Sequence, residues 1–343
     1  MERSFSFMSV QSKIGLAVWA TACLLVVSSP MIGIARADDA SAAKLDRRSR
    51  AKEIIAELLD ETTDFRDRRL RFEKAMKATP EPTRVQIRKV DAAGVDGELI
   101  WPARLHHPFG RRAILYLHGG GFYGGSIRSH RNIAASFAKA SSADVLLIEY
   151  RLLPQYRSPS QVEDAVTAFR WLLESGYDAS NIVVIGDSVG GTLALQMSLR
   201  QIATNGVTPA AVIALSPVAD FEGGGVPAHS KDEVSVSRQW LQQVGKEYAG
   251  KESSALQTVS PINSDFSGFP PILLQVGDKE ALRGDVQRLF EKLKAANVDV
   301  RLDVVPGLFH GASLFPFWLD QARRSNQNAA NFAMTHFADR PPQ

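Results

Sequence analysis

The chain has 343 residues, of which 45% are hydrophobic, and it carries a formal net charge of +3 at pH 7. This apolar content is ample for the buried core of one large domain. The one basic cluster, at 47–52, is followed by acidic residues and is typical of a solvated helix face, so no nucleic-acid partner is expected. The single cysteine, Cys23, lies near the N-terminus, and a mature chain without it can form neither a disulfide nor a metal–thiolate site.

The first 37 residues have the layout of a secretory signal peptide. Basic residues precede an apolar stretch at 14–27, and Ala35-Arg36-Ala37 follows as an A-x-A cleavage signal. We therefore predict cleavage near Ala37 and export to the periplasm or the medium. The alternative is an uncleaved anchor, because the apolar character extends toward the ~20 residues that a membrane span requires. Contact with a membrane is expected only in that case.

The rest of the chain alternates between two patterns. Strand-like apolar runs occur at 98–101, 113–118, 144–150, 182–186, 211–215, 271–276 and 299–305. Helical patterns lie near 129–140, 160–175, 190–202, 281–295 and 317–335. The alternation predicts an α/β fold with a mostly parallel sheet covered by helices on both faces. Two further segments, 44–78 and 233–249, have the spacing of amphipathic helices.

A glycine-rich loop, His118-Gly119-Gly120-Gly121-Phe122, follows the second strand-like run. Consecutive glycines let several backbone N–H groups point into one small volume, as the oxyanion of an acyl-transfer intermediate requires. Gly119, Gly120 and Gly121 are the predicted donors, together with the N–H of Val189. The loop also reads G-x-G-x-x-G, but the next acid, Asp144, begins rather than ends the following strand, so a dinucleotide site fits poorly. No cofactor and no metal are expected.

A serine between two glycines ends the run at 182–185, in the sequence Gly186-Asp187-Ser188-Val189-Gly190. A sharp strand-to-helix turn of this kind needs small flanking residues and exposes the serine side chain. Ser188 is therefore the predicted nucleophile.

A serine nucleophile needs a base and an acid, which in this kind of fold follow it in the order acid, then histidine. Of the three histidines beyond Ser188, only His310 lies on a loop after a strand, the usual place for chemistry in α/β folds. His229 and His336 are interpreted as surface residues. Asp278 and Glu280 both follow the strand at 271–276, and either carboxylate could orient His310.

These motifs together resemble the hormone-sensitive-lipase-like branch of the α/β-hydrolase fold, the bacterial esterases with an HGGG motif. Glu149-Tyr150-Arg151-Leu152-Leu153-Pro154, Ser216-Pro217 with Asp220, and Phe309-His310 add to the likeness. The resemblance implies carboxylic-ester hydrolysis with Ser188 as nucleophile and His310 as base. Members place the acid two residues before a leucine, which favours Glu280 over Asp278.

The resemblance also implies a domain plan and a substrate class. Residues 38–84 form an N-terminal helical cap region, and 85–343 form the catalytic domain with a cap insertion near 222–255. Phe122 and Tyr123 are expected to line an apolar pocket of modest size, suited to short- and medium-chain esters. Hydrolysis of a lactone or an N-acyl amide by the same triad is the alternative reaction. A non-catalytic ligand-binding protein on a hydrolase scaffold is a less favoured hypothesis. The sequence leaves open whether the protein forms a homodimer.

Overall fold

The computed structural model describes residues 33–105, 112–227, 236–250 and 255–338. The chain divides into two units, Met1–Ala42 and Ala43–Gln343, and the sheet, the core and the site described below lie in the second unit. The predicted signal segment and Cys23 lie almost entirely outside the described residues, as does His229. Within the described part, no helix combines the length and the apolar character that crossing a membrane would need.

Eight strands form one sheet in the order β1-β2-β4-β3-β5-β6-β7-β8. The strands are β1 (Val85–Asp91), β2 (Asp96–Pro102), β3 (Ala113–Leu117), β4 (Asp144–Ile148), β5 (Ile182–Asp187), β6 (Ala211–Leu215), β7 (Ile272–Gly277) and β8 (Val300–Val305). β1 and β2 are antiparallel to their neighbours, and the remaining pairs are parallel. The predicted α/β class with a mostly parallel sheet is therefore confirmed.

The central strands are continuous apolar runs because both of their faces are covered. Every residue of β3, β4, β5, β6 and β7 is buried. The sequence did not predict β1, whose polar residues are largely exposed because it is an edge strand with one neighbour.

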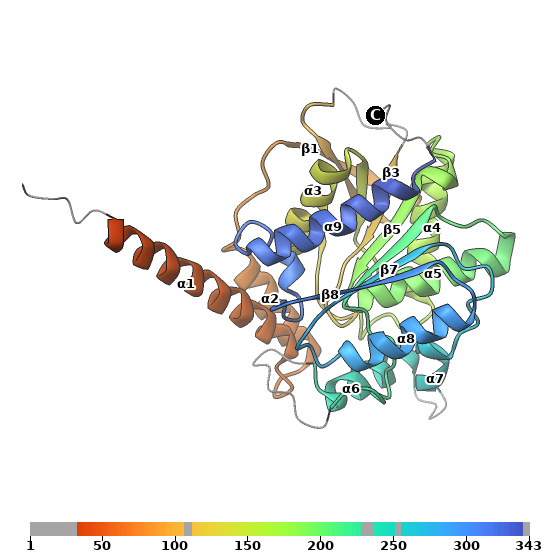
Figure 1. The fold of residues 1–343 in the computed structure, drawn as a ribbon. Coiled ribbons are helices and arrows are strands. Elements are labelled where there is room, and N and C mark those ends of the chain that lie inside the picture. The colour runs from red at the N-terminus through yellow and green to blue at the C-terminus, as the bar shows by residue number, and fades with distance from the viewer. Residues whose placement is uncertain (1–32, 106–111, 228–235, 251–254, 339–343) are drawn as a thin grey trace, which may run out of the picture. The chain divides into compact units, whose positions relative to one another are not determined.

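Nine α-helices are described in this part of the chain. They are α1 (Gly33–Leu59), α2 (Phe65–Met76), α3 (Ile127–Ser141), α4 (Ser160–Glu174), α5 (Val189–Asn205), α6 (Arg238–Ala249), α7 (Ala255–Val259), α8 (Arg283–Ala295) and α9 (Asp320–His336). Short 3₁₀ turns occur at Ala179–Asn181, Pro261–Asn263 and Ala312–Leu314. Figure 1 shows α3 and α9 on one face of the sheet and α4, α5 and α8 on the other.

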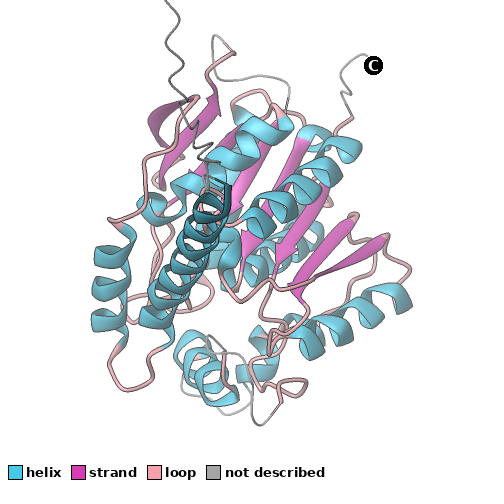
Figure 2. Ribbon diagram, turned by 60° about the vertical axis from the view of Figure 1, so that its left-hand side comes forward, coloured by secondary structure: helices cyan, strands magenta, loops and turns pink. Residues whose placement is uncertain are grey.

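The helices outside the alternation match the two predicted amphipathic segments. Residues 44–78 contain the second half of α1 and all of α2, and 233–249 contain α6. Apolar side chains of these helices join the single hydrophobic core. Figure 2 shows the strands side by side in one sheet with helices packed around it.

Candidate active site

Ser188 lies on a strained turn between β5 and α5. Its backbone has φ 52° and ψ −125°, a conformation that costs an ordinary residue energy and persists only where the surroundings enforce it. The surroundings do so through close backbone packing: a Cβ at Gly186 would lie 2.1 Å from the carbonyl oxygen of Gly190. A Cβ at Gly190 would lie equally close, at 2.1 Å, to the carbonyl oxygen of Leu117. The glycines that flank the serine are therefore required by space.

His310 and Glu280 meet Ser188 across the carboxyl edge of the sheet. The Nε2 atom of His310 lies 3.0 Å from Ser188 Oγ, and its Nδ1 atom lies 3.1 Å from Glu280 Oε2. All three side chains are buried, with 8% of Ser188, 6% of His310 and 5% of Glu280 exposed. The parallel pairing of β7 with β8 and of β5 with β6 places the ends of these strands side by side, which brings the three loops together.

The two acids that follow β7 have different partners. Glu280 Oε1 accepts hydrogen bonds from Ser216 Oγ at 2.8 Å and from the Gly277 N–H at 2.6 Å, which leaves Oε2 facing His310. Asp278 Oδ1 accepts the N–H of Gly307 at 2.8 Å instead. The structure therefore places Glu280, rather than Asp278, in contact with His310. Asp278 instead stabilises the loop that precedes His310, through Gly307.

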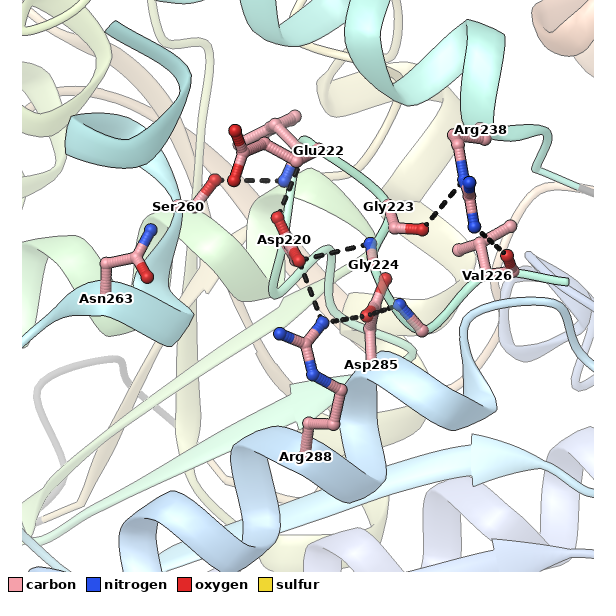
Figure 3. A network of polar contacts seen from close by, with 12 residues as sticks. Asp220, Glu222, Gly223, Gly224, Val226, Arg238, Ser260, Asn263, Asp285 and Arg288 are labelled. Carbon is pink, nitrogen blue, oxygen red and sulfur yellow. Dashed lines mark hydrogen bonds and ion pairs between the residues drawn. The ribbon is translucent and has the colours of Figure 1, made fainter. Parts of the chain in front are cut away.

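A second polar network fixes the start of α8, just beyond Glu280. Asp220 accepts hydrogen bonds from the Gly224 N–H and from Arg288 Nη1, at 3.2 and 2.8 Å (Figure 3). Asp285 accepts from the same Arg288 nitrogen at 2.8 Å and from the Gly225 N–H at 2.6 Å. The network joins the loop after β6 to the helix after β7, so it helps to hold the loop that carries Glu280.

The glycine loop after β3 lies in front of Ser188, but its first glycine has another partner. Gly120 and Gly121 line the cavity beside the serine. The N–H of Gly119 donates to Asp187 Oδ1 at 3.1 Å. Gly119 thus differs from its predicted place among the oxyanion donors: it ties the loop to the nucleophile turn, because the Asp187 side chain reaches back over the neighbouring strand.

Phe122 and Tyr123 were expected in the substrate pocket, and both lie behind it. Phe122 stacks on Tyr248 with ring centres 3.9 Å apart, and Tyr123 stacks on Phe65 at 4.2 Å. The Tyr123 hydroxyl donates to the carbonyl oxygen of Leu58 and accepts from Trp240 Nε1. These rings are fully buried and join the loop to the cap helices rather than facing a substrate.

The cavity at Ser188 is narrow and mostly apolar. Its free volume is about 30 Å³, which is room for roughly two water molecules. The lining residues are Ile55, Leu58, Leu59, Gly120, Gly121, His130, Asp187, Ser188, Trp240, His310, Gly311 and Leu314. The amphipathic pattern predicts the helices that carry the cap residues. It does not single out His130, which precedes Ser188, whereas the base of this kind of fold follows the serine.

Other clefts in the described residues are larger but lack the chemistry. One of about 290 Å³ lies between α3 and α9 and contains Asn132, Lys139 and Asn326. No predicted site residue lines it, so we do not regard it as the site. In the described part of the chain, no group of three or more His, Cys, Asp or Glu side chains is placed to hold a metal ion.

The mostly parallel sheet and the contacts from Ser188 through His310 to Glu280 define the class of the protein as an α/β hydrolase. A family model for the alpha/beta hydrolase fold matches residues 114–314. The chain belongs to this family, in its hormone-sensitive-lipase-like branch.

Individual relatives agree with that assignment. An esterase of Acinetobacter venetianus is 31% identical over 257 residues, which cover 74% of this chain and 84% of the relative. An acetyl-hydrolase of Streptomyces hygroscopicus is 34% identical over 65% of this chain and 76% of its own length. The crystal structure of an esterase from the bacterial hormone-sensitive lipase family superposes with a TM-score of 0.77 at 30% identity, covering 84% of this chain and 99% of that one.

Proposed function

We propose that this protein is a serine carboxylesterase in which Ser188 is the nucleophile, His310 the general base and Glu280 the acid that orients it. One observation carries the proposal: the unbroken line of contacts from Ser188 Oγ through both nitrogens of His310 to Glu280 Oε2, at 3.0 and 3.1 Å. A neutral imidazole in this position takes the serine proton as the oxygen attacks, and the carboxylate stabilises the imidazolium that forms.

The reaction proceeds in two halves. Ser188 Oγ adds to the ester carbonyl, and the resulting oxyanion accepts the N–H groups of Gly120, Gly121 and Val189. His310 then returns the proton to the departing alcohol, which leaves an acyl group on the serine. Water enters, gives a proton to His310 and attacks the acyl carbon, and the carboxylic acid departs as Ser188 regains its proton. Each of the N–H donors is worth on the order of 3 kcal/mol in the transition state.

The substrates are short-chain esters. The narrow cavity at Ser188, with Ile55, Leu58 and Trp240 among its lining residues, favours a small acyl group. Ile55 packs against the histidine loop so closely that a Cβ at Gly311 would lie 2.7 Å from its Cδ1 atom. Two curated relatives bear the names acetyl-hydrolase and ethyl acetate hydrolase, which accords with a small acyl group.

Hydrolysis of p-nitrophenyl esters from acetate to palmitate tests this proposal. We expect the highest kcat/KM with acetate or butyrate and a decrease of kcat by about 10⁵- to 10⁶-fold in Ser188→Ala. Ser267→Ala, which alters an exposed serine, is the matched control and should retain full activity. Retained activity in Ser188→Ala would refute the proposal. The same assay with a lactone and with p-nitroacetanilide decides between ester hydrolysis and the two alternative reactions.

We also propose export and a domain plan from the sequence. The basic start, the apolar stretch and the A-x-A signal support removal of 1–37 near Ala37, which leaves a cap region at 38–84 and a catalytic domain at 85–343 with an insertion near 222–255. N-terminal sequencing of the protein recovered from the periplasm or the medium should begin at Asp38. Recovery of the whole chain in the membrane fraction would favour the uncleaved anchor.

A further inference from the structure

A second histidine lines the cavity at Ser188, and the proposed mechanism does not use it. His130 lies in the first turns of α3 and is 1% exposed. Its Nδ1 atom lies 3.0 Å from Ser129 Oγ, and its Nε2 atom lies 3.5 Å from Asp187 Oδ2. The second distance is that of an ion pair rather than of a well-formed hydrogen bond.

Asp187, the residue before the nucleophile, holds the oxyanion loop. Its Oδ1 atom accepts the Gly119 N–H at 3.1 Å and the Tyr116 hydroxyl at 2.8 Å. The fit is tight, since a Cβ on Gly119 would lie 2.3 Å from Asp187 Oδ2. One carboxylate therefore connects the strand that precedes the glycine loop, the first glycine of the loop, and the turn that carries Ser188.

Asp187 is charged although it is buried. Burial alone would raise the pKa of its carboxyl, but the charge and hydrogen bond of His130 and the hydrogen bond from Tyr116 lower that pKa further than burial raises it. A buried carboxylate without a compensating charge is costly, and it would oppose the development of the oxyanion on the substrate carbonyl beside Ser188.

His130 is the side chain that faces this carboxylate, with its Nε2 atom 3.5 Å from Asp187 Oδ2. The neighbouring His118 stays uncharged, because burial, followed by the charge of His130, lowers the pKa of its imidazole to about 3. The Glu149 carboxyl also lies near His130. Burial raises the pKa of Glu149, and the charge of His130 opposes that rise. The groups that face His130 from the elements around it are Asp187, Tyr116, His118, Glu149 and Ser129.

We propose that His130 and Asp187 form a buried histidine–carboxylate pair that positions the oxyanion loop: Asp187 fixes Gly119 against the nucleophile turn, and His130 holds the Asp187 carboxylate in place. Both are positioning residues, since neither touches the reacting atoms. The inference rests on the proposed ester hydrolysis and assigns to that reaction a second histidine–carboxylate pair with a purely electrostatic and structural task.

A double-mutant cycle with p-nitrophenyl acetate tests the pair. His130→Asn leaves the carboxylate unpaired, and we expect kcat to decrease about thirtyfold with KM changed less than threefold. Asp187→Asn keeps the acceptor for Gly119 and Tyr116 without the charge, and should cost only about threefold. The double variant Asp187→Asn/His130→Asn should be faster than His130→Asn alone, because no unpaired charge remains. His336→Asn, at a partly exposed histidine of α9, is the control.

Two further measurements keep the test decisive. The ¹⁵N chemical shifts of the His130 ring, identified by their loss in His130→Asn, should change in Asp187→Asn, because the carboxylate faces Nε2. If His130→Asn does not fold, Asp187→Ala, which removes the acceptor, should lose about hundredfold in kcat where Asp187→Asn loses little. His130 ring shifts that are unchanged in Asp187→Asn, or a double variant no faster than His130→Asn, would overturn the proposal. Full activity of Ser188→Ala would instead refute the proposed function, and the ¹⁵N result would be unaffected.

Discussion

Two histidine–carboxylate pairs border Ser188, and they differ in what the histidine reaches. His310 lies 3.0 Å from Ser188 Oγ, so a proton can pass between them. His130 faces Asp187 at 3.5 Å, and that carboxylate holds the backbone of Gly119. Both pairs consist of a histidine and a carboxylate, and they differ in their position relative to Ser188 Oγ. The His310 pair can transfer a proton to and from the serine. The His130 pair can only place a charge near the site and fix the backbone of Gly119.

The largest expected effect comes from breaking the first pair at its acid. Glu280→Gln keeps the size of the side chain and the contacts with Ser216 and Gly277, but it removes the charge that orients and stabilises the imidazolium. We expect kcat to decrease by about 10³- to 10⁴-fold with little change in KM. Steady-state kinetics with p-nitrophenyl acetate measure the loss.

Asp278→Asn is the matched variant, because it changes the neighbouring carboxyl in the same way. Asparagine can still accept the N–H of Gly307, so a loss below about threefold is expected. A larger loss in Asp278→Asn than in Glu280→Gln would reverse the assignment of the acid.

A smaller but still large decrease in kcat should follow from disrupting the contact between Asp187 and Gly119 of the oxyanion loop. Gly119→Ala places a methyl group 2.3 Å from Asp187 Oδ2, so the loop or the carboxylate must move. A shift of the loop weakens the oxyanion contacts, and we expect a decrease in kcat of about 10²-fold. Gly176→Ala, at a glycine with open space around the added methyl group, is the control for a glycine replaced without a clash. Equal activity of the two variants would show that the contact with Asp187 does not matter.

The sequence singled out the residues of the first pair, which the structure brings together, but it did not single out His130, for a physical reason. Ser188, Glu280 and His310 each follow a parallel strand, and strand ends are visible as apolar runs that stop at a glycine or a polar residue. His130 lies inside a helix, and its task depends on which face of α3 meets the end of β5. That packing is decided by side chains far apart in the sequence, so no local pattern indicates it.

The same limit explains the pocket. Phe122 and Tyr123 follow the glycine loop directly, yet both turn back to stack on Tyr248 and Phe65. The walls come instead from α1 and α6, whose amphipathic pattern predicts a buried stripe without saying what the stripe covers. The polar edge strand β1 was missed because it has no apolar run.

Enlarging the cavity should change substrate choice more than turnover of the smallest ester. Leu58→Ala removes a side chain that lines the cavity and is 6% exposed. We expect the best substrate to shift from acetate or butyrate toward hexanoate, by about tenfold in relative kcat/KM, at a stability cost of about 2–5 kcal/mol. Leu70→Ala, on an exposed leucine of α2, should change neither property. An unchanged chain-length profile would place the acyl group elsewhere.

The smallest effect concerns stability in acid and depends on the second pair. The pKa of His118 is lowered from 6.5 to about 3 when the protein folds, first by burial and then by the charge of His130. Because the folded value is the lower one, this contribution is fully present above pH 6.5 and is lost as the pH falls toward 3, by at most about 1.4 kcal/mol per pH unit. Urea unfolding at pH 6.5, 5.5 and 4.5 should show this slope in the wild type and a smaller one in His118→Asn. His130→Asn should lie between them, since it removes one of the causes that lower this pKa. A slope in His130→Asn equal to that of the wild type would mean that His130 does not affect the protonation of His118.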